Sequence, residues 1–367
     1  MGHRQGPMEG MVIDSLMPNP NFWRGKNVLV TGHSGFKGAW LCFWLLRMGA
    51  KVTGVSLPPV TLPNLFDLAG LESHVKSHWV DVRSEEEIQK IFDHTQPDIV
   101  LHLAAQALVR PSYAEPASTF STNILGTLNV LEASRKTHSV RSIVAVTTDK
   151  VYKNHEGGLA FRESDPLGGH DPYSASKAGA EMVIASYRKS FFGPAGVGLA
   201  AARAGNVIGG GDWSVDRILP DAVRAWSGSI ALAVRNPRAT RPWQHVLEPL
   251  NGYLGLAQKI FESPKSACDF NFGPDPQKVA TVQQVATLAR AAFGRGDISW
   301  EEGTGDLHEA LALTLDNSKA KVQLGHYPVW ELETAIARTM EWYRLQLEGR
   351  NATDLCEGDV HFYLSVT

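Results

Sequence analysis

The chain has 367 residues, of which 43% are hydrophobic and 20% are charged, and its formal net charge is −3. This length allows one large domain or two closely joined ones, and the evenly spread basic residues do not predict nucleic-acid binding. The longest uninterrupted apolar run, residues 39–46, is far shorter than the ~20 residues that cross a membrane. We therefore expect neither a nucleic-acid nor a membrane partner.

Residues 1–21 are expected to form an N-terminal extension outside the fold, because they begin with a polar stretch and carry no secretory signal. The three cysteines, Cys42, Cys268 and Cys356, are few and far apart. Such an odd, sparse set predicts structural thiols rather than disulfides or a metal site, and it is typical of the cytoplasm.

Short β-branched runs alternate with helical periods from residue 26 to about residue 146. The expected strands cover residues 27–30, 51–55, 78–80, 98–102 and 142–146, and the expected helices cover residues 39–48, 85–94 and 122–135. The strands are continuously apolar rather than alternating, which indicates a sheet covered on both faces. The sequence therefore predicts an α/β fold with a doubly wound parallel sheet of the Rossmann type.

After about residue 206 the chain is richer in Gly, Pro and Trp, and its periodic segments are shorter. We expect this part to include a smaller C-terminal α/β domain that contacts the substrate. The Rossmann domain is expected to span residues 22–206 plus about 243–265, and the substrate domain about 207–242 and 266–356.

A GxxGxxG run lies between the first expected strand and the first expected helix. Glycines there allow a tight turn and close backbone approach, so that the helix N-terminus can hold a pyrophosphate. A glycine-rich turn without a ligand is the alternative interpretation. The candidate cofactor contacts of this loop are Gly32, His33, Gly35, Phe36, Lys37 and Gly38.

Dinucleotide-binding folds usually carry an acidic residue at the end of the second strand, about 20 residues further on. Ser56 stands there instead, and no arginine is placed for a 2′-phosphate, so NAD is the favoured cofactor over NADP. Asp81 and Val82, after the third strand, are candidate adenine contacts. A helix-capping role for Asp81 is equally open.

Tyr173 and Lys177 lie four residues apart and share one face of a helix. A neighbouring ammonium favours the phenolate, so this pair predicts a general base that removes a hydroxyl proton while hydride leaves the same carbon. Thr148, Asp149 and Lys150 follow the strand at residues 142–146, at the sheet edge where such folds bind ligands. Polar groups are costly to bury there without a function.

These motifs occur in the same order, with HLAA at residues 102–105 and TNILGT at residues 122–127, in the extended short-chain dehydrogenases/reductases. The chain resembles this family over roughly residues 21–342. Its Thr-Asp pair resembles the nucleotide-sugar 4,6-dehydratases, whereas epimerases of this fold usually carry Ser-Ala there. Lys150, GGGDW at residues 209–213 and RPWQHV at residues 241–246 resemble the subgroup that acts on CDP-glucose.

The resemblance implies an NAD-dependent lyase of deoxysugar and O-antigen biosynthesis, which turns CDP-glucose into CDP-4-keto-6-deoxyglucose and water. It implies that Tyr173 removes the C4 hydroxyl proton, that Lys177 holds the phenolate, that Thr148 bonds the C4 oxygen and that Asp149 protonates the C6 hydroxyl. Lys150 stands where relatives use Glu as the C5 base. It either serves as that base or only orients Asp149.

The resemblance also implies further contacts and an assembly. Ala104 and Ala105 join Tyr173 and Lys177 as cofactor contacts. The implied substrate contacts are Arg110, Asn206, Arg217, Arg241 and His308. Helices near residues 122–135 and 175–191 are expected to pair into a homodimer or a dimer of dimers.

Three other functions were compared with this one. An epimerase of the same fold would need no acid at C6, so Asp149 argues against it. A non-catalytic NAD-sensing module would be expected to lose Tyr173 or Lys177, and an interaction module would lack an intact Thr148–Asp149 pair. All four residues are present.

Overall fold

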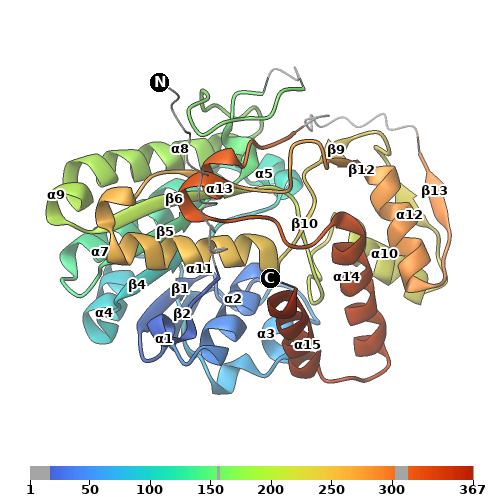
Figure 1. The fold of residues 1–367 in the computed structure, drawn as a ribbon, viewed down its shortest axis with the longest axis horizontal. Helices are drawn as coiled ribbons and strands as arrows, with labels where there is room; N and C mark the ends of the chain where they lie inside the picture. Colours follow the sequence, from blue (N-terminus) through green and yellow to red (C-terminus); the bar gives the residue numbers. More distant parts are fainter. Residues whose placement is uncertain (1–16, 155–157, 302–312, 367) are drawn as a thin grey trace, which may run out of the picture.

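A seven-stranded sheet forms the centre of the computed structural model, which describes residues 17–154, 158–301 and 313–366 (Figure 1). The strand order is β11-β6-β5-β4-β1-β2-β3, and every neighbouring pair is parallel. The strands are β1 (Asn27–Thr31), β2 (Lys51–Ser56), β3 (Lys76–Trp79), β4 (Ile99–His102), β5 (Ser142–Val146), β6 (Gly198–Ala204) and β11 (Phe270–Phe272). The order reverses between β1 and β4, so the predicted doubly wound sheet is confirmed.

Helices cover both faces of this sheet, which explains its continuously apolar strands. Ile99 and Leu101 of β4 belong to one buried cluster, whereas Val100 belongs to a second. The first cluster includes α2 (Phe36–Arg47) and α11 (Leu247–Glu262). The second includes α4 (Glu85–Thr95), α7 (Gly126–Lys136) and α8 (Pro172–Tyr187).

A smaller group of elements lies beside the sheet, on the right of Figure 1. It contains α10 (Ile218–Ser227), α12 (Val282–Phe293) and α14 (Leu332–Leu347), the pair β8 (Leu232–Val234) and β13 (Ile298–Trp300), and the pair β9 (Thr240–Arg241) and β12 (Ala280–Thr281). From there α15 (Ala352–Ser365) returns to pack against α2 and α3 (Leu65–Leu68).

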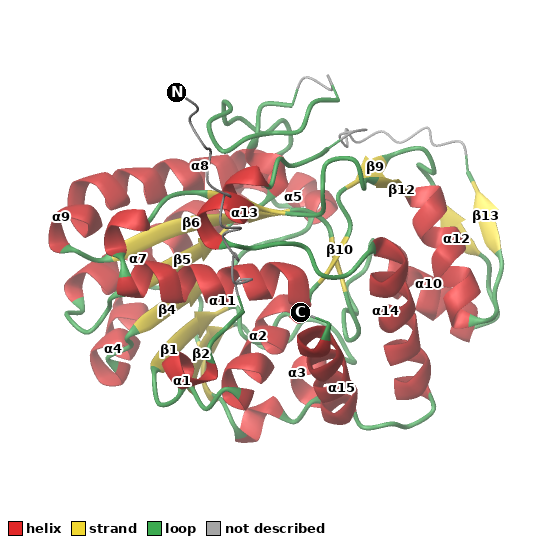
Figure 2. Cartoon of the chain, in the orientation of Figure 1, coloured by secondary structure: helices red, strands yellow, loops and turns green. Residues whose placement is uncertain are grey.

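The remaining short elements connect these parts (Figure 2). They are α1 (Pro20–Trp23), α5 (Val109–Ala114), α6 (Pro116–Phe120), α9 (Gly193–Ala195), α13 (Ser318–Leu324), β7 (Val207–Ile208) and β10 (Gln244–His245), with single helical turns between them. In the described parts of the chain, no helix is both long and apolar enough to cross a membrane.

Two elements differ from the expectation. The expected helix at residues 122–135 continues from α6 through a wider π-helical turn, Ser121–Leu125, into α7. β11 pairs with β6 in the large sheet, although a boundary at residue 266 would assign it to the substrate domain. β11 spans three residues, too few to show a period, so the proposed boundaries do not follow the sheet at this point.

The triple glycine at residues 209–211 lies where the smaller group of elements meets the Rossmann core. A Cβ on Gly210 would lie 2.1 Å from the Trp342 ring, and the carbonyl of Gly210 accepts a hydrogen bond from Trp40 Nε1 at 2.9 Å. Gly211 has a φ of 82°, which side chains rarely adopt. Gly210 therefore lets the segment after β7 pass close to Trp40 and Trp342.

Candidate active site

The glycine loop forms a concave backbone surface at the N-terminus of α2. Gly32 has a φ of +73°, and a Cβ there would lie 2.8 Å from the amide nitrogen of Ala104. A Cβ on Gly38 would lie 2.0 Å from the carbonyl oxygen of Gly32. Thr31 Oγ1 accepts hydrogen bonds from the amides of Leu103 and Ala104, both at 3.1 Å. The loop and the end of β4 thus meet through backbone atoms, in a geometry that suits a pyrophosphate.

Two of the predicted cofactor contacts pack beneath this loop. His33 is fully buried and stacks on Trp79 with ring centroids 5.2 Å apart, and its Nε2 lies 3.0 Å from Ser77 Oγ. Burial lowers the pKa of His33 to about 4. Ser56 Oγ lies 2.8 Å from Ser34 Oγ, inside the same loop. Both side chains therefore support the loop from the protein side.

Asp81 lies after β3 and is held by Arg83. Its carboxylate accepts the Arg83 amide at 2.9 Å and the guanidinium at 2.6 Å, and this partner lowers the pKa of Asp81. The N-cap of α4 is Ser84, so the capping role considered for Asp81 is not what the structure shows. Val82 is buried against Gly126, at the start of α7.

One cavity of about 690 Å³ opens at the carboxyl edge of the sheet. The predicted residues that line it come from both halves of the chain. They are Lys37, Arg110, Thr148, Asp149, Lys150, Tyr173, Asn206, Arg217 and Arg241. Lys177 lies one helical turn beyond Tyr173, and His308 falls outside the described residues. The topology therefore brings together side chains that are far apart in sequence.

Thr148 and Asp149 begin a short turn directly after β5. Asp149 is 1% exposed, and its Oδ1 accepts a hydrogen bond from Thr148 Oγ1 at 2.9 Å. Lys150 Nζ lies 3.7 Å from the same oxygen. Among the described residues, Asp149 Oδ2 has no hydrogen-bond partner although it is buried. Because Asp149 also lines the cavity, this oxygen is placed to bond a group bound there.

Tyr173 lies in the first turn of α8, which begins after Asp171. Asp171 Oδ1 caps the helix by accepting the Ser174 amide at 3.0 Å, and Pro172 occupies the first helical position. Burial raises the pKa of Tyr173 to about 12, while a hydrogen bond with Thr148 acts in the opposite direction. Tyr173 and Thr148 both line the cavity.

The expected effect of Lys177 on Tyr173 is not seen. Lys177 Nζ donates to the carbonyl of Val146 at 3.1 Å, and burial lowers the pKa of Lys177 to about 8. Glu181, one turn further along α8, raises the pKa of Lys177 against that burial. The sequence argument considered only the charge of the ammonium, whereas burial dominates the pKa values of both groups.

Positive charge predominates around the cavity. Among the described residues, its lining includes three carboxylates, of Asp149, Asp171 and Asp216. The cationic side chains of the lining are Lys37, Arg110, Lys150, Lys153, Arg217, Arg235 and Arg241. Burial, with Arg217 and Lys177 nearby, lowers the pKa of Lys37 to about 7. Such a lining suits a diphosphate, because arginine forks bond two phosphate oxygens at once.

Sequence reasoning missed Arg235 and Asp216. Asp216 Oδ1 lies 3.1 Å from Arg235 NH2 and 4.0 Å from Arg110 Nε, so it bridges two cations from different parts of the chain. Neither residue belongs to a motif that the sequence analysis used. The positive φ of Asp216, 59°, is uncommon for a residue with a side chain, but nothing in the sequence indicates it.

A second, smaller cavity of about 200 Å³ adjoins the first. Asn206, Arg217, Arg235 and Arg241 line both cavities. The smaller cavity also includes all three residues of β8. The two cavities together provide room for a sugar next to Tyr173 and for a longer group that extends toward β8.

A sequence model described as GDP-mannose 4,6 dehydratase matches residues 29–339. The chain belongs to this family. Of its relatives within the dehydratases, a CDP-glucose 4,6-dehydratase of Salmonella typhimurium is 43% identical over 358 residues, which cover 96% of this chain and 99% of the relative. A dTDP-glucose 4,6-dehydratase of Xanthomonas campestris is 26% identical over 334 residues, or 86% and 92% of the two chains.

A solved structure shows the same fold as this dehydratase-family chain. MoeE5 in complex with UDP-glucose and NAD superposes with a TM-score of 0.74 at 23% identity, covering 87% of this chain and 99% of the other. At this level of identity the likeness concerns the fold.

Proposed function

We propose that this protein is an NAD-dependent CDP-glucose 4,6-dehydratase, which converts CDP-glucose into CDP-4-keto-6-deoxyglucose and water. The observation that carries the proposal is the 43% identity to a CDP-glucose 4,6-dehydratase over nearly the full length of both chains. The dTDP-glucose enzyme is 26% identical. The cavity supports the same reaction class, because it places Thr148, Asp149 and Tyr173 together below a cationic rim.

The glycine loop is the proposed NAD site. Its residues fit a dinucleotide, because Gly32 and Gly38 allow the loop backbone to pack tightly on itself and on Ala104 at the N-terminus of a twelve-residue helix, where backbone amides can hold a pyrophosphate. Ala104 and Ala105, at the end of β4, complete this edge. When bound there, NAD would supply the hydride acceptor and donor that oxidation at C4 and reduction at C6 require.

The side chains of the cavity move the protons of this reaction. Tyr173, as the phenolate, takes the proton of the C4 hydroxyl as general base, and Thr148, whose hydroxyl would turn from Asp149 Oδ1 to the substrate, donates to the C4 oxygen. The ketone at C4 acidifies C5, which allows the C6 hydroxyl to leave as water. Asp149, whose Oδ2 is open, protonates that hydroxyl. An epimerase needs no such acid, which favours the dehydratase reaction.

Lys150 keeps two possible roles. Its ammonium lies 3.7 Å from Asp149 Oδ1 and is partly exposed in the cavity. As C5 base it would exchange the C5 proton with solvent, whereas as an orienting cation it would act only through Asp149. Deuterium from solvent that still enters C5 in Lys150→Met would assign the orienting role.

The nucleotide is proposed to lie along the arginine-lined side of both cavities. Asn206, Arg217 and Arg241 line both cavities, so they are placed to contact the diphosphate, and Arg110 lines the larger cavity. His308 remains a proposal from the sequence. The base would then extend toward β8, where backbone groups can be matched to one base edge.

Purified protein is expected to turn over CDP-glucose in preference to dTDP-glucose, UDP-glucose and GDP-mannose. A site that hydrogen-bonds one base edge leaves buried groups unpaired with another, and such mismatches lower kcat/KM by up to about 10⁴–10⁵-fold. The alkali-sensitive absorbance of the 4-keto sugar measures each reaction. Equal kcat/KM for all four substrates would remove the CDP assignment, and no keto sugar from any of them would remove the dehydratase function.

Replacing Gly38 by alanine is expected to weaken NAD binding by roughly 5- to 150-fold, since backbone overlap costs about 1–3 kcal/mol. The new methyl group would meet the Gly32 carbonyl at 2.0 Å. Gly358→Ala in α15, away from this loop, is the control, because its Cβ would lie 3.9 Å from Arg338 and meet no backbone. Calorimetric titration of both variants with NAD measures the difference. Equal affinity in Gly38→Ala and the wild-type protein would contradict the proposed site.

We also propose a homodimer, or a dimer of dimers, built on the outer face of α7 and α8. Large apolar side chains are exposed along this side of the fold, namely Phe120, Leu125, Met182 and Phe191. Burying such a face against a second copy removes apolar area from water. Light scattering is expected to give at least twice the 40.0 kDa of one chain. A monomer at micromolar concentration would exclude this assembly.

A cytoplasmic location is proposed on a separate observation. The three cysteines are free thiols, and Cys42 and Cys356 are buried. Such thiols fit a reducing compartment.

A further inference from the structure

A buried ion pair lies behind the turn that contains Thr148 and Asp149, which we call the catalytic turn. The two charged residues of the pair do not line the cavity. Arg203 of β6 and Glu181 of α8 are each 2% exposed. Two parallel hydrogen bonds join them, from Arg203 Nε to Glu181 Oε1 at 2.9 Å and from NH2 to Oε2 at 2.8 Å. Such a bidentate pair fixes the angle as well as the distance between its partners.

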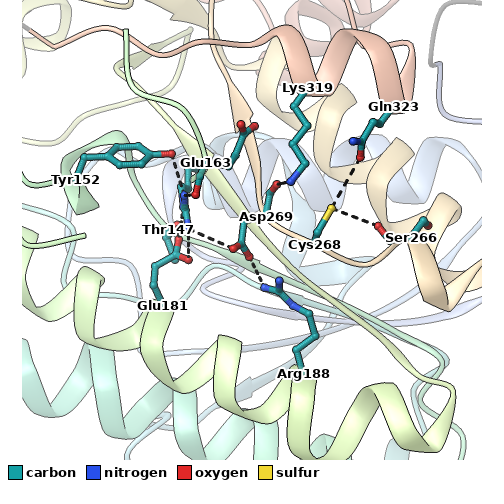
Figure 3. Close-up of polar contacts among 11 residues, drawn as sticks. Thr147, Tyr152, Glu163, Glu181, Arg188, Ser266, Cys268, Asp269, Lys319 and Gln323 are labelled. Carbon is teal, nitrogen blue, oxygen red and sulfur yellow. Dashed lines mark hydrogen bonds and ion pairs between the residues drawn. The ribbon is translucent and has the colours of Figure 1, made fainter. Parts of the chain in front are cut away.

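Both ends of the catalytic turn are attached to this pair. Glu181 Oε1 accepts the hydroxyl of Thr147 at 2.5 Å, and Arg203 NH1 donates to the hydroxyl of Tyr152 at 2.9 Å. Figure 3 shows Thr147, Tyr152 and Glu181 converging on one point. We call Thr147, Tyr152, Glu181 and Arg203 the rear clamp; Thr147 and Tyr152 also line the cavity, and the ion pair lies behind them.

The rear clamp also connects to β11, the end strand of the sheet next to β6. The hydroxyl of Tyr152 donates to Asn271 Oδ1 at 2.7 Å, and Asn271 lies in β11. The ring of Tyr152 also lies against the Arg203 guanidinium, 5.1 Å from its centroid. The clamp therefore joins β5, β6, β11 and α8 around the segment that contains Thr148 and Asp149.

Catalytic groups are divided between the two elements that the clamp connects. Thr148 and Asp149 lie between Thr147 and Tyr152, while Tyr173 and Lys177 lie on α8, the helix that carries Glu181. Thr148 and Tyr173 both line the cavity, so their separation depends on the distance between that turn and that helix. A misplacement of about 1 Å can cost about 10²-fold in rate.

We propose that Thr147 and Tyr152 are positioning residues, which act through the Glu181–Arg203 pair to set Thr148 and Asp149 against Tyr173 for proton transfer at C4 and C6. The kinetic part of this proposal rests on the proposed dehydratase function. The structural part does not.

Thr147→Val is the sharpest test, because valine keeps the shape and removes the hydroxyl. The backbone of Thr147 remains bonded to Ala202 of β6 at 2.9 Å, and Glu181 keeps both bonds to Arg203. We expect kcat to fall by about 10- to 100-fold with KM nearly unchanged. Glu181 and Arg203 themselves are unsuitable, because removing one leaves the other charged and buried.

A double-mutant cycle distinguishes positioning from general stability. If Thr147 acts through the turn, the loss in Thr147→Val/Thr148→Val is smaller than the product of the two single losses by more than about twofold. A full product, or an unchanged kcat in Thr147→Val, would overturn the proposal. Thr339→Val is the control: its buried hydroxyl bonds only within α14, to Ala335 O at 2.7 Å, and it should leave kcat unchanged.

Amide hydrogen exchange tests the clamp without any substrate. Residues 148–152 are expected to exchange faster in both Thr147→Val and Tyr152→Phe than in the wild-type protein, at equal thermal stability of the core strands. Unchanged exchange in both variants would overturn the proposal. If none of the four nucleotide sugars reacts with the wild-type protein, the proposed function fails, and this measurement still decides whether the clamp holds the turn.

Discussion

Replacing Tyr173 by phenylalanine is expected to lower kcat by about 10²–10⁴-fold, the usual contribution of a general base. The ring is buried and its packing would remain, so only the phenol is lost. Affinity for NAD and for CDP should stay within a few-fold of the wild-type values. Single-turnover formation of the keto sugar, together with calorimetric titrations, measures the two quantities separately.

The control is Tyr187→Phe on the same helix, whose hydroxyl donates to Glu132 at 2.6 Å, away from the cavity. That variant should retain normal turnover. Near-normal turnover of Tyr173→Phe would assign proton removal to another group. Asp149 Oδ2 would then be the first candidate, because it is a buried oxygen without a hydrogen-bond partner in a residue that lines the cavity beside Thr148.

Asp149→Asn is expected to separate the two halves of the reaction. The amide oxygen can still accept the Thr148 hydroxyl, so the geometry of the turn should survive, but the variant has no proton to give to the C6 hydroxyl. Oxidation at C4 then proceeds while water loss slows by about 10²–10⁴-fold. Stopped-flow absorbance should show reduced nicotinamide that forms and persists.

Two outcomes would contradict this assignment. Normal keto-sugar formation would show that another acid protonates the C6 hydroxyl. A variant that forms no reduced nicotinamide at all, although it binds NAD and CDP normally, would show that Asp149 already acts in the oxidation step.

Runs of consecutive apolar residues predicted the strands that such runs form. β4 and β5 are continuous apolar runs followed by turn residues, so their places in a covered parallel sheet could be inferred. Asp149 was expected at the ligand-binding edge of the sheet because it follows the carboxyl end of β5, and it lines one cavity with Tyr173 of α8. The strand β6 was not predicted. β11 could not be found in this way, because its position depends on a pairing with β6 across more than sixty residues of chain.

The active-site residues likewise divide into those that belong to short motifs and those whose partners are distant in sequence. Asp149 and Lys177 were found because they belong to motifs with a chemical meaning. Arg203 and Asp216 were not assigned roles, because a buried ion pair or a bridging carboxylate depends on partners distant in sequence. The sequence predicted a lowered pKa for Tyr173 from the neighbouring ammonium, whereas burial in the folded chain raises this pKa.

The crowding of cations around the cavity has a consequence for proton balance. Because the pKa of Lys37 is lowered to about 7, a substantial fraction of this amine is neutral at physiological pH. A diphosphate in the cavity would favour the ammonium and raise that pKa. Binding of the nucleotide sugar would then draw a proton from solvent, so that its affinity declines as the pH rises above about 7. Substrate capture would then be coupled to the acidity of the surroundings before any bond in the sugar is broken.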